Sequence, residues 1–178
     1  MTFPQRAIGV ARLEVPVFEE VEADRQATTQ ALIIVVLSSM AGGIGLTSGF
    51  YNAPVLHRVM LALLLWVFWA TATYIVGVYL MPEPQTETNV GELLRTIGFA
   101  ASPGILRIFG FIPALGEVIY GLSTAWMFVA MVIAIRQALD YKSTGRAIVV
   151  CLITWTIALF LAAMAGAILF LFAEEVVS

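Results

Sequence analysis

The chain has 178 residues, of which 61% are hydrophobic and 12% are charged, and its mean hydropathy is +0.96. This composition excludes an ordinary soluble domain and indicates an all-α, polytopic membrane protein. The net charge of −3 excludes the basic surface that nucleic-acid binding requires. A single histidine, His57, and a single cysteine, Cys151, exclude most metal constellations, so we expect no cofactor.

The first 27 residues lack an apolar core and carry five acids, so they predict a tail rather than a cleaved signal. Pro16 suits the first turn of a short helix, and Glu19 and Glu20 behind it favour the positive end of the helix dipole. Phe18 and Val21 would share one face of that helix, which could dock on the membrane surface or on loops. A mobile acidic tail is the alternative.

Crossing about 30 Å of hydrocarbon takes roughly 20 apolar residues. Five segments of the chain reach or approach this length, and they predict a bundle of five transmembrane helices followed by a short tail over 174–178. The predicted spans are about 28–49, 56–81, 93–113, 117–136 and 147–173.

The third of these segments is interrupted by Pro103 and Arg107. Proline lacks an amide donor, so we expect a kink near 99–102. A charge inside the bilayer is costly, and the short turn after the segment brings Glu117 near as a partner for Arg107. Pairing with Glu117, snorkelling to the interface and an ion site or gate are the three open interpretations of Arg107.

The distribution of basic residues favours five complete crossings with the N-terminus in the cytoplasm and the C-terminus outside. Cytoplasmic loops carry an excess of Lys and Arg. With five crossings, seven basic residues lie inside, against Arg58 and Arg107 on the other side. The seven are Arg6, Arg12, Arg25, Arg95, Arg136, Lys142 and Arg146.

Small residues at spacings of three or four predict close helix packing in lipid, either within the bundle or at a homodimer seam. The residues expected to serve this packing are Gly42, Gly45, Gly49, Gly98, Ala162 and Gly166. Catalytic patterns are missing from the sequence, because the only histidine has no acidic partner at a motif spacing. We therefore expect a non-enzymatic protein.

Two stretches carry a family resemblance: "VFEEVEADRQATTQAL" and the run from "LLRTIGFAASPGILRIFGFIPALGEVIYG" through "AIRQAL" to "STGRA". They resemble the Yip domain of Ypt/Rab-interacting multi-pass membrane proteins in its short prokaryotic form. The resemblance implies five spans and a cytoplasmic N-terminus. In eukaryotes this family is associated with Golgi and ER traffic and with Rab GTPases, but a "DLYGP"-like segment is not found here. A Rab-type partner is therefore not expected.

We expect an integral scaffold or adaptor of the prokaryotic cytoplasmic (inner) membrane, whose partners are lipids, other membrane proteins or further copies of itself. A small permease or channel using the broken third span and an accessory subunit of a larger membrane complex are the alternatives. The residues expected to bind a partner lie in the tail and in the loop after the fourth span, where opposite charges favour mutual contact. They are Phe18, Glu19, Glu20, Glu22, Asp24, Arg136, Asp140, Lys142 and Arg146.

Overall fold

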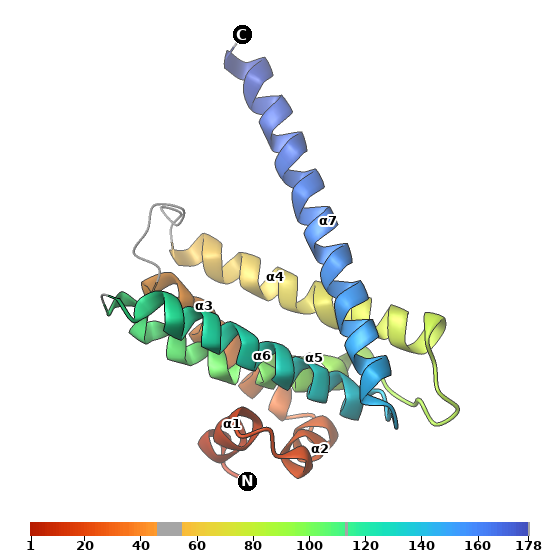
Figure 1. Cartoon of the computed structure of the whole chain (residues 1–178). Helices are drawn as coiled ribbons and strands as arrows, with labels where there is room; N and C mark the ends of the chain where they lie inside the picture. Colours follow the sequence, from red (N-terminus) through yellow and green to blue (C-terminus); the bar gives the residue numbers. More distant parts are fainter. Residues whose placement is uncertain (46–54, 113, 178) are drawn as a thin grey trace.

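The computed structural model describes residues 1–45, 55–112 and 114–177, and every regular element within these ranges is helical (Figure 1). In chain order the elements are α1 (Phe3–Ala11), α2 (Val15–Ala23), α3 (Ala27–Gly45), α4 (Val55–Tyr74), the π-helix η2 (Ile75–Leu80), α5 (Val90–Ala100), the 3-10 helix η3 (Ser102–Phe111), α6 (Gly116–Ala138) and α7 (Thr144–Val177).

Four helical stretches are long and apolar enough to cross a membrane: Ala27–Ile44, Val59–Leu80, Gly116–Ala138 and Thr144–Leu161. They correspond to the first, second, fourth and fifth predicted spans, so the prediction of an all-helical membrane protein is confirmed. The predicted count of five spans is not confirmed, because the third predicted span is divided between α5 and η3 and is not among the four stretches. The difference arises where Pro103 interrupts the segment.

The divided third segment still lies along the bundle. Asn89 caps α5, because its Oδ1 accepts from the Glu92 amide at 3.1 Å while Glu92 Oε2 accepts from the Asn89 amide at 3.0 Å. The α-helix ends at Ala100, and the tighter η3 begins two residues later with the buried Pro103 in its first turn. Both pieces pack against α3 and α6, as Figure 1 shows.

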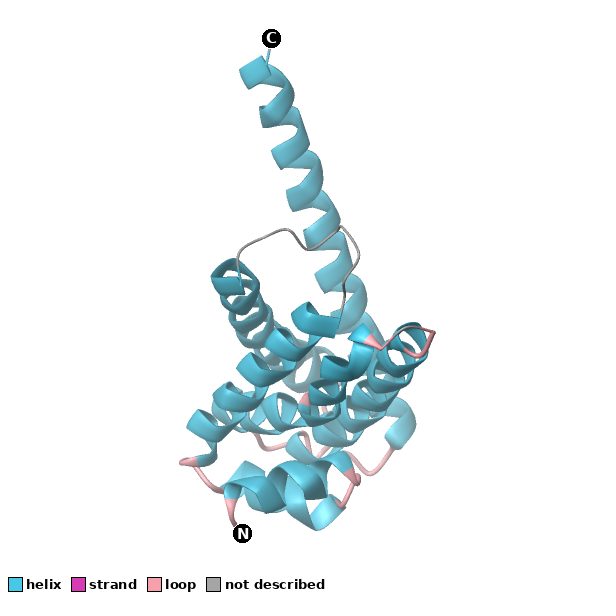
Figure 2. Ribbon diagram, turned by 90° about the vertical axis from the view of Figure 1, so that its left-hand side faces the viewer, coloured by secondary structure: helices cyan, strands magenta, loops and turns pink. Residues whose placement is uncertain are grey.

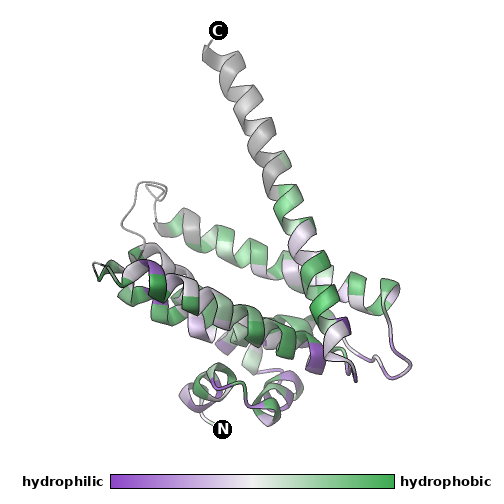
Figure 3. Cartoon of the chain, in the orientation of Figure 1, coloured by the Kyte–Doolittle hydropathy of each residue, from purple (hydrophilic) through white to green (hydrophobic). Residues whose placement is uncertain are grey.

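The N-terminal tail forms two helices, where the sequence predicts one short helix or a mobile tail. We call α1 and α2 together the cap. The two helices turn at Leu13, whose φ is 64°, and lie against the side of the bundle, beneath it in both views (Figures 1 and 2). Val10, Val17 and Val21 are at most 1% exposed in a core shared with the bundle. Figure 3 shows hydrophilic residues concentrated on the cap beneath a hydrophobic bundle.

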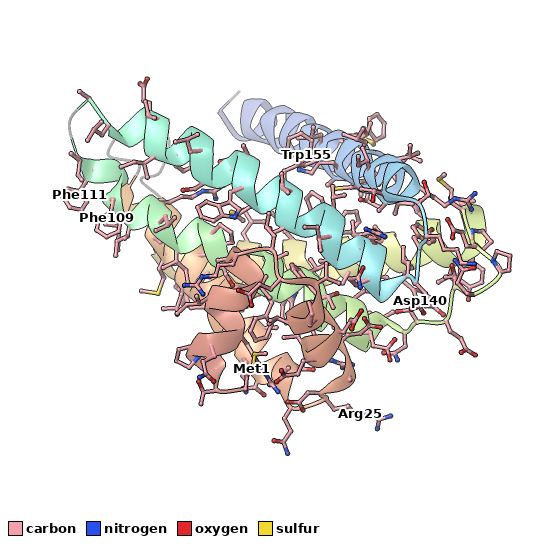
Figure 4. All side chains as sticks on the ribbon, turned by 60° about the horizontal axis from the view of Figure 1, so that its bottom comes forward. Met1, Arg25, Phe109, Phe111, Asp140 and Trp155 are labelled. Atoms are coloured by element: carbon pink, nitrogen blue, oxygen red, sulfur yellow. The ribbon has the colours of Figure 1, made fainter. Side chains whose placement is uncertain are left out.

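Two loops lie at the end of the bundle that α2 approaches, which we call the cap end. Gln85 Nε2, between η2 and α5, donates to the Asp140 carbonyl at 2.9 Å, between α6 and α7. Gln137 Nε2 near the end of α6 donates to Glu19 Oε1 in the cap at 3.1 Å. Figure 4 shows Asp140 at the opposite end of the bundle from Phe109 and Phe111. The α5–η3 segment therefore runs from the cap end to the far end.

The structure describes the surroundings of two of the six small residues that are predicted to mediate helix packing. A Cβ at Gly98 would lie 2.7 Å from Ala31 Cβ and 3.0 Å from Trp66 Nε1, so glycine lets α5 approach α3 and α4 closely. Gly42 lies on α3 and contributes to a cavity described below. Gly49 lies outside the described residues, as do the surroundings of Gly45, Ala162 and Gly166.

Candidate functional site

The residue expected to anchor a partner from the tail is buried. Phe18 is 0% exposed and belongs to the core between the cap and the bundle, so its side chain is not available at the surface. The expectation that Phe18 binds a partner is corrected for this reason. Its i, i+3 neighbour Val21 is also 0% exposed, so the apolar face of α2 docks on the protein itself.

Two of the tail acids bind a cation inside the cap. Arg6, whose side chain is 9% exposed, pairs with Glu20 at 3.0 Å and with Asp24 at 2.7 Å, and its Nη1 also donates to Gln30 on α3 at 3.2 Å. The N-terminal ammonium pairs with Glu20 at 2.7 Å and lowers the pKa of that carboxyl, while Arg6 lowers the pKa of Asp24. The carboxylates of Glu20 and Asp24 are therefore paired within the cap and stabilise it.

Among the basic residues at the α6–α7 loop, Arg146 pairs with an acid of the loop between η2 and α5 rather than with the acidic tail. Arg146 Nε lies 3.4 Å from Glu83 Oε1, and its Nη1 donates to the Pro82 carbonyl at 2.8 Å. The Lys142 amide donates to Glu83 Oε2 at 3.1 Å, and Arg136 Nε donates to the Tyr141 carbonyl at 3.3 Å. Among the described residues, the expected pairs between tail acids and loop cations therefore do not occur.

Acids from α2, α5 and the α6–α7 loop instead lie near Glu22 at the cap end, and we call Glu19, Glu22, Glu92 and Asp140 the acidic platform. Burial, followed by repulsion from Asp140 and Glu92, raises the pKa of Glu22 to about 7. Burial also raises the pKa of Asp140. Glu19 and Asp140 are exposed, so the platform presents negative charge at the surface.

Sequence reasoning counted Arg95 only as a cytoplasmic charge and missed its contacts. Its side chain is 5% exposed, and Nε lies 3.2 Å from the Val21 carbonyl and 2.9 Å from the Glu22 carbonyl, to which Nη2 also donates. Arg95 thus satisfies carbonyls at the end of α2 and fastens the cap to α5. No spacing in the sequence predicts this contact, because 73 or more residues separate Arg95 from the two carbonyls.

A second candidate site surrounds the half-buried Arg107, on η3. Arg107 Nη2 donates to Thr124 Oγ1 on α6 at 2.8 Å, and the Thr124 hydroxyl in turn donates to the Tyr120 carbonyl at 2.7 Å. The guanidinium carbon lies 4.5 Å from the centroid of the Tyr120 ring, which is a cation–π contact. Within the described ranges Arg107 forms no salt bridge, so Thr124 and Tyr120 take the place predicted for Glu117.

The Arg107 side chain keeps unused hydrogen-bonding capacity. Its buried Nε has no acceptor among the described residues, although a buried donor of this kind costs about 1–3 kcal/mol when unpaired. Thr124 lies eight residues after the start of α6 at Gly116, which is about 12 Å along the helix. A charge at such a depth costs on the order of 3 kcal/mol on insertion scales.

Arg107 borders a cavity of about 350 Å³ between α3, α4, η3 and α6. Its lining is mostly apolar and includes the hydroxyl-bearing Ser38, Ser39 and Tyr120. A Cβ at Gly104 would collide with Ser38 Oγ and lie 2.7 Å from Met127 Sδ, so glycine at this position lets η3 and α3 meet beside the cavity. We call this space the Arg107 cavity.

No group of three or more histidine, cysteine or acidic side chains suited to a metal ion occurs among the described residues. In the comparison with known protein families, a family model described as the Yip1 domain aligns with residues 13–165. No curated protein and no solved structure matches the chain.

Proposed function

The chain belongs to the Yip1 domain family, and from that premise we propose that it is a non-enzymatic membrane scaffold or adaptor of the cytoplasmic membrane of a prokaryote. One observation carries the proposal: the N-terminal segment is folded onto the bundle as a cap, fastened by Arg95 and by buried valines and Phe18. A docked cap offers a preformed surface, and preformed surfaces lose less entropy on binding than mobile tails.

The surface that this adaptor offers to a partner is the acidic platform at the cap end. Glu19 and Asp140 are its exposed members, and each comes from a different element. Excess negative charge on one surface favours association with a segment rich in lysine and arginine. The partner is therefore a protein with a basic segment near the membrane surface, or a second copy of the chain that exposes its own basic residues there.

Site-specific photocrosslinking in native membranes tests the adaptor proposal. A crosslinker at Glu19 or Asp140 should capture one defined partner, whereas a crosslinker at the exposed Glu117 at the far end should not. The double reversal Glu19→Lys and Asp140→Lys should abolish the product at a third platform position, Glu92. Equal capture at Glu117, or a product that persists through the charge reversal, would contradict the role of this surface.

We also propose five crossings with the cap in the cytoplasm. The α5–η3 segment supports this topology, because it runs the height of the bundle and contains 11 residues of α-helix and ten of 3-10 helix. At about 1.5 and 2.0 Å per residue these would extend about 36 Å, enough to cross the hydrocarbon. Seven of the nine Lys and Arg residues then share the cytoplasmic side.

Cysteine accessibility tests the topology. Lys142→Cys and Glu117→Cys place single reporters at the two ends, and the native Cys151 is buried and reacts little in comparison. A membrane-impermeant thiol reagent applied to intact cells should label the residue at 117 but not that at 142. Labelling at 142 but not at 117 would exclude the crossing of the α5–η3 segment, because it would reverse the orientation of α6.

A small permease is a second candidate function, favoured by the Arg107 cavity and by the break between α5 and η3. In proteoliposomes, an anion flux that Arg107→Ala abolishes would support transport. A flux that survives this change, or its absence in the wild type, would remove transport through the cavity from consideration.

A further inference from the structure

Arg107 differs from an arginine that serves only to join two helices. A guanidinium has five N–H donors, and the described contacts of Arg107 use one of them, to Thr124 Oγ1. The second contact, with the Tyr120 ring, holds the positive charge without a carboxylate. The arrangement positions a cation at the wall of a cavity and leaves its charge available to a ligand.

The cavity itself has the size and composition of a ligand site. Its volume of about 350 Å³ lies within the range of roughly 300–1,000 Å³ that is typical of small-molecule sites. Apolar side chains from three helices line it, among them Val35, Leu61 and Met127, and Ser38 and Ser39 add hydroxyl groups beside the arginine. Such a lining fits a ligand that carries one charged group and an apolar part.

We propose that the Arg107 cavity binds a phosphate-class oxyanion, carried by a membrane lipid or free in solution. Guanidinium and phosphate form charge-assisted hydrogen bonds of matching geometry, which the mostly apolar lining of the cavity strengthens. The apolar walls favour a lipid as the carrier, because an acyl chain would replace water against Val35, Leu61 and Met127. This inference concerns the cavity between α3, α4, η3 and α6, so it does not depend on the adaptor role of the cap.

The test uses the full-length chain in nanodiscs of phosphatidylcholine. In one arm phosphatidylglycerol is added as a minority lipid, and its retention by the extracted protein is measured by native mass spectrometry. In the other arm inorganic phosphate replaces chloride at equal ionic strength, and the shift in thermal unfolding is measured. The wild type should retain one phosphatidylglycerol or be stabilised by phosphate, and the arm that responds identifies the source of the oxyanion.

Three variants test whether the probe binds in the Arg107 cavity. Arg107→Gln should weaken binding of the responding probe by about tenfold or more, as expected for a lost hydrogen bond to a charged group. Arg12→Gln, at a side chain 71% exposed, removes the same charge and should change binding less than about twofold. Ala62→Leu narrows the cavity without touching the arginine and should also weaken binding.

The outcomes separate clearly. Binding of neither probe to the wild type overturns the proposal, as does an equal loss in Arg12→Gln and Arg107→Gln, because surface charge would then explain it. If Arg107→Gln fails to fold, Ala62→Leu decides: unchanged binding in that variant overturns the site, and weakened binding supports it.

Discussion

The arginines of the cap contact and the arginine of the bundle have different kinds of partner. In the cap, Arg6 meets two carboxylates within 3.0 Å, and Arg95 meets backbone carbonyls at the end of α2. In the bundle, Arg107 meets one hydroxyl and one aromatic ring beside a cavity. Carboxylates and carbonyls occupy the donors of Arg6 and Arg95, so these arginines hold the cap in place. A hydroxyl and a ring leave most donors of Arg107 available to a ligand.

The largest effect should come from breaking the apolar contact beneath the cap. Phe18→Ala removes a fully buried aromatic side chain, and such truncations cost about 3–5 kcal/mol. The cap should then detach, which limited proteolysis within the first 27 residues would report. Phe109→Ala is the matched control, because Phe109 is 49% exposed on η3 and its loss should leave the cap protected. A protected cap in Phe18→Ala would contradict its role as the anchor.

The second largest effect on stability should come from replacing Arg6, whose guanidinium is paired with two carboxylates. Arg6→Gln leaves Glu20 and Asp24 without their shared cation and should destabilise the cap, though less than the loss of a fully buried pair would, because both acids are partly exposed. Denaturant unfolding in detergent would measure it. Arg12→Gln removes the same charge from an exposed side chain and should change stability by less than about 0.5 kcal/mol. Similar losses in the two variants would show that the carboxylate contacts contribute nothing.

The acidic platform should make cap stability depend on pH. The folded pKa of Glu22, about 7, exceeds its ordinary value of 4.5. The folded state therefore binds more protons between these values, so the contribution of Glu22 is fully present below about pH 4.5 and is lost as the pH rises through about 7.

Glu22→Gln should remove this pH dependence. Above about pH 8 the variant should be more stable than the wild type by about 1–2 kcal/mol, once solvent screening is allowed for. Near pH 4.5 the two proteins should differ little. Thermal unfolding across this window measures the gap, and Glu14→Gln at an exposed side chain provides the control for a change of net charge. A gap that stays constant with pH would contradict the burial and repulsion assigned to Glu22.

The smallest effect on stability should follow the loss of Arg107, which sharpens the comparison between the two arginines. Arg107→Gln gives up one hydrogen bond and one cation–π contact but also removes a buried donor that lacks an acceptor. These contributions oppose each other, so unfolding in ligand-free detergent should change by less than about 1 kcal/mol. A loss as large as that of Arg6→Gln would show that Arg107 is a structural fastener.

Local signals in the sequence anticipated several parts of the fold and one part of the candidate site. Apolar length predicted the four membrane-length helices, because a lipid environment requires each span to satisfy its own backbone. Pro103 and Arg107 marked the unusual third segment, since both residues carry a penalty inside a spanning helix. The apolar face of α2, with Phe18 and Val21, was also visible as a periodic pattern.

The partners of these residues were beyond sequence reasoning. Charge alone suggested that Arg107 pairs with Glu117 and that tail acids pair with loop cations, but Thr124 and Glu83 lie closer in space. Arg95 binds carbonyls across more than 70 residues, and a backbone carbonyl has no signature in the sequence. Which acceptor an arginine reaches depends on how the helices pack.

The sequence by itself determined that this protein is helical, apolar and interrupted at Pro103, because these properties follow from chain composition and from the local demands of lipid on the backbone. Only the tertiary structure decided that the tail becomes a docked cap and that Arg107 borders a cavity. Both outcomes depend on contacts between distant helices, whose energies are set by shape complementarity rather than by residue type along the chain.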